Sequence, residues 1–193
     1  MEFTLDEAEK DYLVSVARES ILSFLDGRPA RYGPLPASGK DKARALESAC
    51  GAFVTLHKGH ALRGCIGRMS ATAPLLETIK SMARSAAFED PRFPPLAKEE
   101  FAACVLEISV LSPMQACEHH GDVIVGTHGV YLTHRGRSGV FLPQVPVEQG
   151  WNREEYLEQL CHKAGLPPHS YREADAQLYI FTALVFGEPK EKG

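Results

Sequence analysis

Apolar residues recur every three or four positions near the start of the chain, which predicts an amphipathic helix. Thr4 and Glu7 have the spacing of a capping box, so we expect the helix to begin there and to run to about residue 25. Residues 26–40 are rich in glycine and proline and predict a loop, either a rim or lid over a site or an ordinary surface connection. The apolar stripe of the helix consists of Leu13, Val16, Ala17, Phe24 and Leu25.

Alternating apolar positions then predict a β-hairpin. Residues 50–57 and 62–69 have the pattern of its two strands, and residues 58–60 form the turn between them. Helical spacing resumes around Pro74, a residue that is tolerated in the first turn of a helix. The proline-rich segment 86–96 is expected to end this helix.

The second half of the chain predicts mostly strands. Residues 101–111 are apolar and β-branched, and residues 123–142 have the pattern of three short strands separated by glycine-containing turns. Two prolines predict an extended ribbon at residues 142–146, Asn152 predicts the cap of another helix, and residues 178–186 predict a last strand. Because the strands occur in antiparallel-looking groups with helices between them, we expect an α+β fold.

Length and charge narrow the class of protein. A chain of 193 residues allows one domain, or one domain with two lobes. The net charge of −4 argues against nucleic-acid binding, which normally needs a basic surplus. The sequence contains no apolar run of the roughly 18 residues that a membrane span requires. The acidic first seven residues do not resemble a signal peptide, so we expect a cytoplasmic protein.

The five cysteines are widely spaced, odd in number and without a CxxC pair, which argues against a disulfide framework and a zinc ribbon. The eight histidines show no spacing typical of metal ligands. The sequence therefore predicts no metal site, and it names no cofactor.

Candidate chemistry centres on Cys65, which has a glycine on either side at Gly64 and Gly67. The glycines would leave the thiol unshielded and allow a ligand to come close. Strand side chains repeat every two residues, so we expect Arg63 and Cys65 to project from the same face, where a guanidinium favours the reactive thiolate. Two other interpretations stand beside this one. Cys65 could be an inert buried residue, or Arg63 and Arg68 could clamp a carboxylate or phosphate with Cys65 as lining.

Several residues elsewhere have side chains suited to a site. Glu107 is an acid within an apolar strand and is expected either to face solvent or to be held by a partner such as an arginine. Arg92 and Phe93 lie in the proline-rich segment, and Gln144 lies in the ribbon between two prolines. The candidate substrate-binding residues are Arg68, Arg92, Phe93, Gln144, Glu148 and Trp151.

Five segments together resemble the AMMECR domain family, whose bacterial and archaeal members are called AmmeMemoRadiSam system protein A. The segments are Leu-Arg-Gly-Cys-Ile-Gly at 62–67, Phe-Glu-Asp-Pro-Arg-Phe-Pro-Pro-Leu at 88–96, Glu-Ile-Ser-Val-Leu-Ser at 107–112, Phe-Leu-Pro-Gln-Val-Pro at 141–146 and Leu-Cys-His-Lys-Ala-Gly-Leu at 160–166. They occur in the family's order and span nearly the whole chain.

The resemblance implies one domain over residues 1–193, built of two unequal lobes on antiparallel sheets, with a cleft that the cysteine motif faces. It also implies two partners, because such proteins are often encoded beside, or fused to, a Memo-like protein related to extradiol dioxygenases, and beside a radical S-adenosylmethionine protein. It implies no particular reaction.

Two functional hypotheses follow. In the first, the chain is a thiol-dependent enzyme or enzyme subunit, with Cys65 as nucleophile and Arg63 either lowering its pKa or holding an anionic substrate. The candidate proton acceptors are Glu107, Glu148, His57 and His134.

In the second hypothesis the chain is a non-catalytic binding or scaffold module. Its arginines would hold an anionic ligand, a peptide or a partner protein, and the aromatic and amide side chains would anchor it. The residues involved would be Arg63, Arg68, Arg92, Phe93, Gln144 and Trp151.

Overall fold

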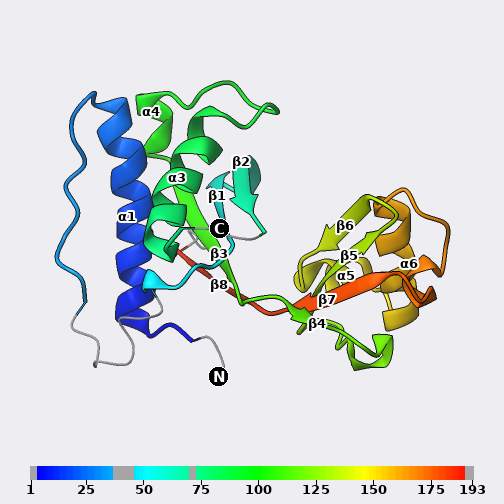
Figure 1. Cartoon of the computed structure of the whole chain (residues 1–193). Coiled ribbons are helices and arrows are strands. Elements are labelled where there is room, and N and C mark those ends of the chain that lie inside the picture. The colour runs from blue at the N-terminus through cyan, green and yellow to red at the C-terminus, as the bar shows by residue number, and fades with distance from the viewer. Residues whose placement is uncertain (1–3, 37–45, 70–72, 190–193) are drawn as a thin grey trace. The chain divides into compact units, whose positions relative to one another are not determined.

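The computed structural model describes residues 4–36, 46–69 and 73–189, and these residues form two compact units (Figure 1). The first unit comprises Met1–Leu111 and Leu184–Gly193, and the second comprises Ser112–Ala183. Each unit has its own four-stranded antiparallel sheet and its own apolar core. The α+β class predicted from the sequence is therefore confirmed.

The sheet of the first unit has the strand order β2-β1-β3-β8. Alternate residues of its central strands, such as Val54 and Leu56, are fully buried on the face that α1 and α3 cover. The intervening residues, Thr55 among them, point to the opposite face. The elements are α1 (Glu7–Leu25), β1 (Ala52–Lys58), β2 (Ala61–Arg68), α3 (Leu75–Phe88), α4 (Lys98–Phe101), β3 (Cys104–Leu111) and β8 (Ala183–Gly187).

Helix α1 begins two residues later than the sequence predicts. Asp6 is its N-cap, accepting from the Glu9 N–H, and the Glu9 carboxylate accepts from the Asp6 N–H. Thr4 and Glu7 have the same spacing, but Asp6 and Glu9 form the reciprocal pair. Their negative charges also interact favourably with the positive N-terminal end of the helix dipole. The capping box was thus predicted with the right spacing and the wrong residues.

The sheet of the second unit has the order β4-β7-β5-β6, and α6 packs against it. Asn152 caps α6 and forms a capping box with Glu155, which confirms the predicted cap. Gly165 follows the helix with φ of +69°. The elements are β4 (Gln115–Ala116), β5 (Gly129–His134), β6 (Arg137–Phe141), α5 (Gln144–Gln149), α6 (Arg153–Lys163) and β7 (Gln177–Phe181), with short 3₁₀ turns at His120–Asp122 and Ser170–Arg172.

Three sequence predictions are wrong in the second half of the chain. Residues 123–125 form no strand. The expected ribbon at 142–146 is instead the start of α5, because Pro143 is its N-cap and Pro146 lies in the first turn, where a missing N–H does no harm. The single strand expected at 178–186 is two strands, β7 and β8, which belong to different sheets.

The two ends of the second unit are hydrogen-bonded to each other. The Ser112 N–H donates to the Thr182 carbonyl at 2.9 Å, and the Thr182 N–H donates to Oγ of Ser112 at 2.9 Å. The chain thus enters and leaves this unit through two adjacent backbone segments. Among the described residues, no helix has the length and apolar character needed to cross a membrane.

Candidate functional site

Cys65 lies on β2, an edge strand of the first unit's sheet, and is paired with Thr55 of β1. Thr55 is paired in turn with Glu107 of β3, so the three residues form a row across the sheet. Directly opposed side chains project from the same face, here the one away from the helices. The Thr55 hydroxyl donates a hydrogen bond to Sγ of Cys65, with Oγ1 and Sγ 3.2 Å apart.

The backbone of Cys65 is held by the proline-rich segment that follows α3. Its N–H donates to Oδ2 of Asp90 at 2.8 Å, and its carbonyl accepts from Nη2 of Arg92 at 3.3 Å. Both groups therefore point away from β1, which makes Cys65 and Thr55 a non-hydrogen-bonded pair. Such pairs bring Cα atoms to about 4.5 Å, the closest approach in an antiparallel ladder, and this explains the contact between thiol and hydroxyl.

An imidazole lies beside the carboxylate of this row. His57 is two residues beyond Thr55 on β1, and its Nε2 lies 3.9 Å from Oε1 of Glu107. Within the described chain, Nε2 of His57 is buried and has no hydrogen-bond partner. The side chains of His57 and Glu107 are 20% and 27% exposed, and Cys65 and Thr55 are also partly buried. A thiol, a hydroxyl, a carboxylate and an imidazole thus share one accessible face.

The glycines around Cys65 serve packing inside the protein. A Cβ on Gly64 would lie 2.2 Å from the Ala86 carbonyl oxygen of α3, and one on Gly67 would lie 2.2 Å from the Phe53 ring. The sequence suggested that these glycines leave space for a ligand. The structure shows that α3 and Phe53 occupy that space.

Arg63 does not follow the regular alternation of β2. The pairing steps from Leu56 opposite Gly64 to His57 opposite Leu62, so Arg63 is the extra residue of a β-bulge.

The Arg63 guanidinium binds the Glu100 carboxylate through two hydrogen bonds of 3.0 Å and also donates to the Pro94 carbonyl. Hydrogen bonds from Arg63 and then Lys58 lower the pKa of Glu100 to about 2. Within the described chain the hydrogen bond to the Cys65 sulfur comes from the Thr55 hydroxyl, whereas the Arg63 guanidinium, which was expected beside the thiol, binds Glu100.

Arg92 links the proline-rich segment after α3 to β2. It binds the buried Asp90 carboxylate through Nε at 2.9 Å and Nη2 at 2.7 Å. These bonds, and the N–H groups of Cys65 and Arg92, hold the pKa of Asp90 well below its usual range. The Phe93 ring lies near both guanidinium groups, 5.7 Å from Cζ of Arg63 and 5.5 Å from that of Arg92. Arg68 is exposed at the end of β2.

The remaining cysteines are less suited to act as nucleophiles. Cys50, Cys104 and Cys161 are buried, and Cys117 is partly buried. Desolvation by burial raises the pKa of all four thiols. A raised pKa leaves less of the reactive thiolate at neutral pH.

The other predicted site residues belong to the second unit. Trp151 packs edge-on against Phe141, with ring centroids 5.5 Å apart, and contributes to that unit's core. Gln144 begins α5, and Glu148 is exposed on the same helix. The predicted site residues therefore belong to two units. Cys65, Arg63, Glu107, Arg92 and Phe93 lie in the first unit, and Gln144, Glu148 and Trp151 lie in the second.

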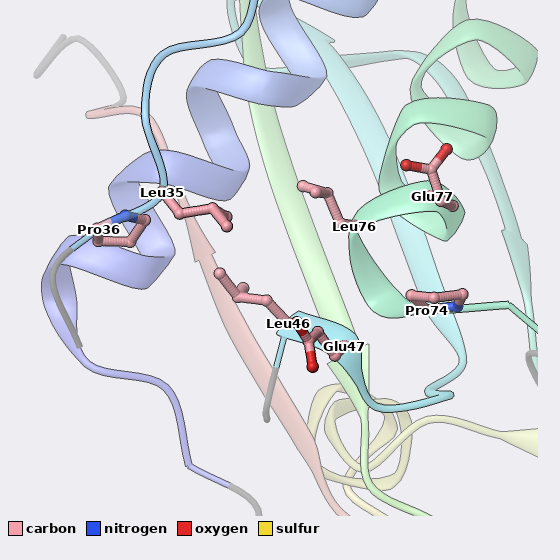
Figure 2. Close-up of a pocket in the computed structure, with 7 residues that line it drawn as sticks. All are labelled: Leu35, Pro36, Leu46, Glu47, Pro74, Leu76 and Glu77. Carbon is pink, nitrogen blue, oxygen red and sulfur yellow. The ribbon is translucent and has the colours of Figure 1, made fainter. Parts of the chain in front are cut away.

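The predicted rim or lid lies against α1 over its described part. Nη1 of Arg28 binds Oε1 of Glu19 on α1 at 2.6 Å, and the Tyr32 and Ser20 hydroxyl oxygens are 3.1 Å apart. Residues 37–40 of the predicted loop lie outside the described residues. An apolar cavity of about 230 Å³ lies beside the described part of this loop. It is lined by Leu35, Pro36, Leu46, Glu47, Pro74, Leu76 and Glu77 (Figure 2).

Two residues that hydrogen-bond to Cys65, Thr55 and Asp90, were not predicted from the sequence. Thr55 is a polar residue between two apolar residues of a predicted strand. This alternation indicates that its side chain lies on the outer face of the sheet. Asp90 precedes a proline, a context typical of turns, so nothing in its surroundings distinguished it.

Comparison with known proteins gives one consistent result. A model of the AMMECR1 family matches residues 14–186. Protein MK0488 of Methanopyrus kandleri is 38% identical over 199 residues, covering 98% of this chain and 92% of its own. Protein PH0010 of Pyrococcus horikoshii is 37% identical over 203 residues, covering 100% and 96%. The crystal structure of PH0010, described as an uncharacterized protein, matches with a TM-score of 0.81 at 37% identity, covering 100% of this chain and 97% of its own.

Proposed function

The chain belongs to the AMMECR1 family, and we propose that it is a thiol-dependent enzyme, or a subunit of one, in which Cys65 is the nucleophile. The observation that carries this proposal is the hydrogen bond from the Thr55 hydroxyl to Sγ of Cys65 at 3.2 Å. A hydrogen bond donated to sulfur stabilises the thiolate more than the thiol. The group in contact with the sulfur is thus the Thr55 hydroxyl.

Glu107 and His57 supply the proton acceptor in this proposal. They lie on the same face as Cys65 and next to each other, with His57 Nε2 3.9 Å from Glu107 Oε1. A nucleophilic thiol needs such a base within reach, directly or through one water molecule. Of the other bases considered, His134 and Glu148 belong to the second unit.

The alternative of a non-catalytic anion-binding module has less support. Its main residue, Arg63, is 8% exposed and already bound to Glu100 and the Pro94 carbonyl. Arg92 is bound to Asp90. Arg68 remains exposed, but a single exposed arginine is not a specific clamp.

The first test is alkylation of the native protein with iodoacetamide across roughly pH 5 to 10, with each cysteine quantified by mass spectrometry. We expect Cys65 to react fastest of the cysteines at neutral pH. Cys117, which is also partly buried, is the internal control. A Cys65 that reacts no faster than Cys117 contradicts the proposal.

Substitution of Thr55 separates activation from simple accessibility. Thr55→Val removes the hydroxyl and keeps the shape of the side chain, so the alkylation of Cys65 at neutral pH should slow several-fold. Thr55→Ser restores a hydroxyl and should recover most of the rate. Equal rates in both variants would show that the hydrogen bond does not activate the thiol.

The family resemblance supports the further proposal that the partners are a Memo-like protein and a radical S-adenosylmethionine protein. Calorimetric titration of each purified protein with this chain tests it directly. Binding that persists in Cys65→Ser would indicate a docking role separate from the thiol. Absence of saturable binding to both proteins would refute the partnership and leave the thiol chemistry untouched.

A further inference from the structure

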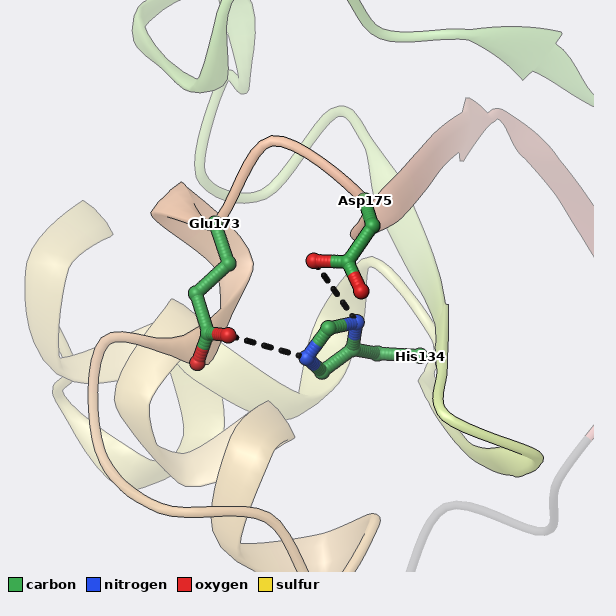
Figure 3. Close-up of side chains that lie close together, drawn as sticks. All are labelled: His134, Glu173 and Asp175. Carbon is green, nitrogen blue, oxygen red and sulfur yellow. Dashed lines mark hydrogen bonds and ion pairs between the residues drawn. The ribbon is translucent and has the colours of Figure 1, made fainter.

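The second unit brings together three potential metal ligands that are far apart in the sequence. His134 is the last residue of β5, and Glu173 and Asp175 lie in the segment before β7. Figure 3 shows the imidazole between the two carboxylates, one facing each ring nitrogen. One ligand atom from each residue can be chosen so that all three lie within 4.8 Å of one another.

The imidazole itself points to a ligand. The His134 side chain is 1% exposed, and Nε2 lies 3.2 Å from Oε2 of Glu173. Among the residues that the structure describes, Nδ1 has no hydrogen-bond partner, and it faces Oδ1 of Asp175 at 3.7 Å. That distance is too long for a hydrogen bond. It is close to the roughly 3.0 to 3.5 Å between neighbouring ligand atoms when each is about 2.1 Å from a shared zinc ion.

Charge and access are consistent with a bound cation. Arg135 is the cation already present, with Nη2 2.7 Å from Glu173 and Nε 4.0 Å from Asp175. The two carboxylates and the Arg135 guanidinium together carry a net charge of −1. The Asp175 side chain is 68% exposed, which leaves coordination positions for water. Glu173 also lines a polar cavity of about 250 Å³.

We propose that His134, Glu173 and Asp175 bind a divalent first-row transition metal ion such as Zn²⁺ or Co²⁺. One imidazole nitrogen with two carboxylate oxygens suits these ions, whereas Mg²⁺ and Ca²⁺ prefer ligand sets made of oxygen alone. The ion binds through one ring nitrogen of His134, and its arrival competes with Arg135 for Glu173.

The test is calorimetric titration of the chelator-treated protein with Zn²⁺, and with Co²⁺ followed by its visible absorption. Asp175→Asn and Glu173→Gln should each weaken binding tenfold or more, because each removes a charged ligand. Asp175 is exposed and Glu173 is half-buried, so neither change disrupts the core. Arg135→Gln should strengthen binding, since it removes the competing cation. That opposite direction cannot arise from a variant that merely unfolds.

Two matched controls exclude other ligands. A second set of possible ligands, Glu154, Glu158 and His169, has atoms as closely spaced as those of the proposed site. Glu158→Gln removes one member of this second set and should leave the affinity unchanged. Cys117→Ser tests a thiol that lines the cavity beside Glu173. The proposal is overturned if no saturable binding occurs at about 100 μM Zn²⁺. It is also overturned if Cys117→Ser abolishes binding, or if Asp175→Asn and Glu173→Gln both leave it intact.

Discussion

Replacing Asp90 with asparagine should destabilise the protein by about 2 to 3 kcal/mol at neutral pH. The Asp90 side chain is 2% exposed, and its oxygens accept from the Cys65 N–H and from the N–H and guanidinium of Arg92. Asparagine keeps one acceptor and turns the other into a donor. A buried N–H left without an acceptor costs about 1 to 3 kcal/mol, and the ion pair with the half-exposed Arg92 adds less than about 1 kcal/mol.

Urea unfolding of the wild type and Asp90→Asn measures this difference, with Glu89→Gln as an exposed neighbouring control that should change stability by less than about 0.5 kcal/mol. The pKa of Asp90 is lower in the folded than in the unfolded chain. Its contribution is therefore complete above the unfolded value of about 4 and disappears as the pH falls through the folded value. The gap between the two proteins should narrow in acid. A loss below about 1 kcal/mol, or a gap that widens in acid, would refute the reasoning.

Two further substitutions test the packing around the site. Gly64→Ala should destabilise by about 2 kcal/mol or more in thermal unfolding, because the new Cβ meets the Ala86 carbonyl at 2.2 Å, whereas Gly33→Ala meets nothing within 4 Å and should be nearly neutral. Arg63→Met should cost about 2 to 3 kcal/mol in urea unfolding by leaving the Glu100 carboxylate without its main partner. Because the pKa of Glu100 is lowered to about 2, that cost should be present above about pH 4.5 and shrink in acid; a pH-independent cost would contradict it.

The sequence predicts regular elements well where local signals are complete. The hairpin, the helix capped by Asn152 and the strand ending at Leu111 all appear close to their predicted positions. The failure at Pro143 and Pro146 arose because proline suits the first turn of a helix as well as an extended ribbon. Local pattern does not choose between these two conformations.

The candidate site was predicted only in part, because the local pattern does not determine the register of the hairpin either. A regular hairpin that pairs Lys58 with Ala61 would place Thr55 opposite Gly64. The bulge at Arg63 shifts the register by one residue and puts Thr55 opposite Cys65 instead. A one-residue shift reverses which side chains share a face, and no local signal in the sequence announces it.

The hydrogen-bonded pair of Ser112 and Thr182 has an evolutionary consequence. A segment whose two ends lie together can be inserted into a pre-existing domain without separating the strands on either side of it. The second unit therefore has the geometry of an inserted module, since the first unit is interrupted at Leu111 and resumes at Leu184. An ancestral protein that joined β3 to β8 by a short turn would retain the sheet that carries Cys65.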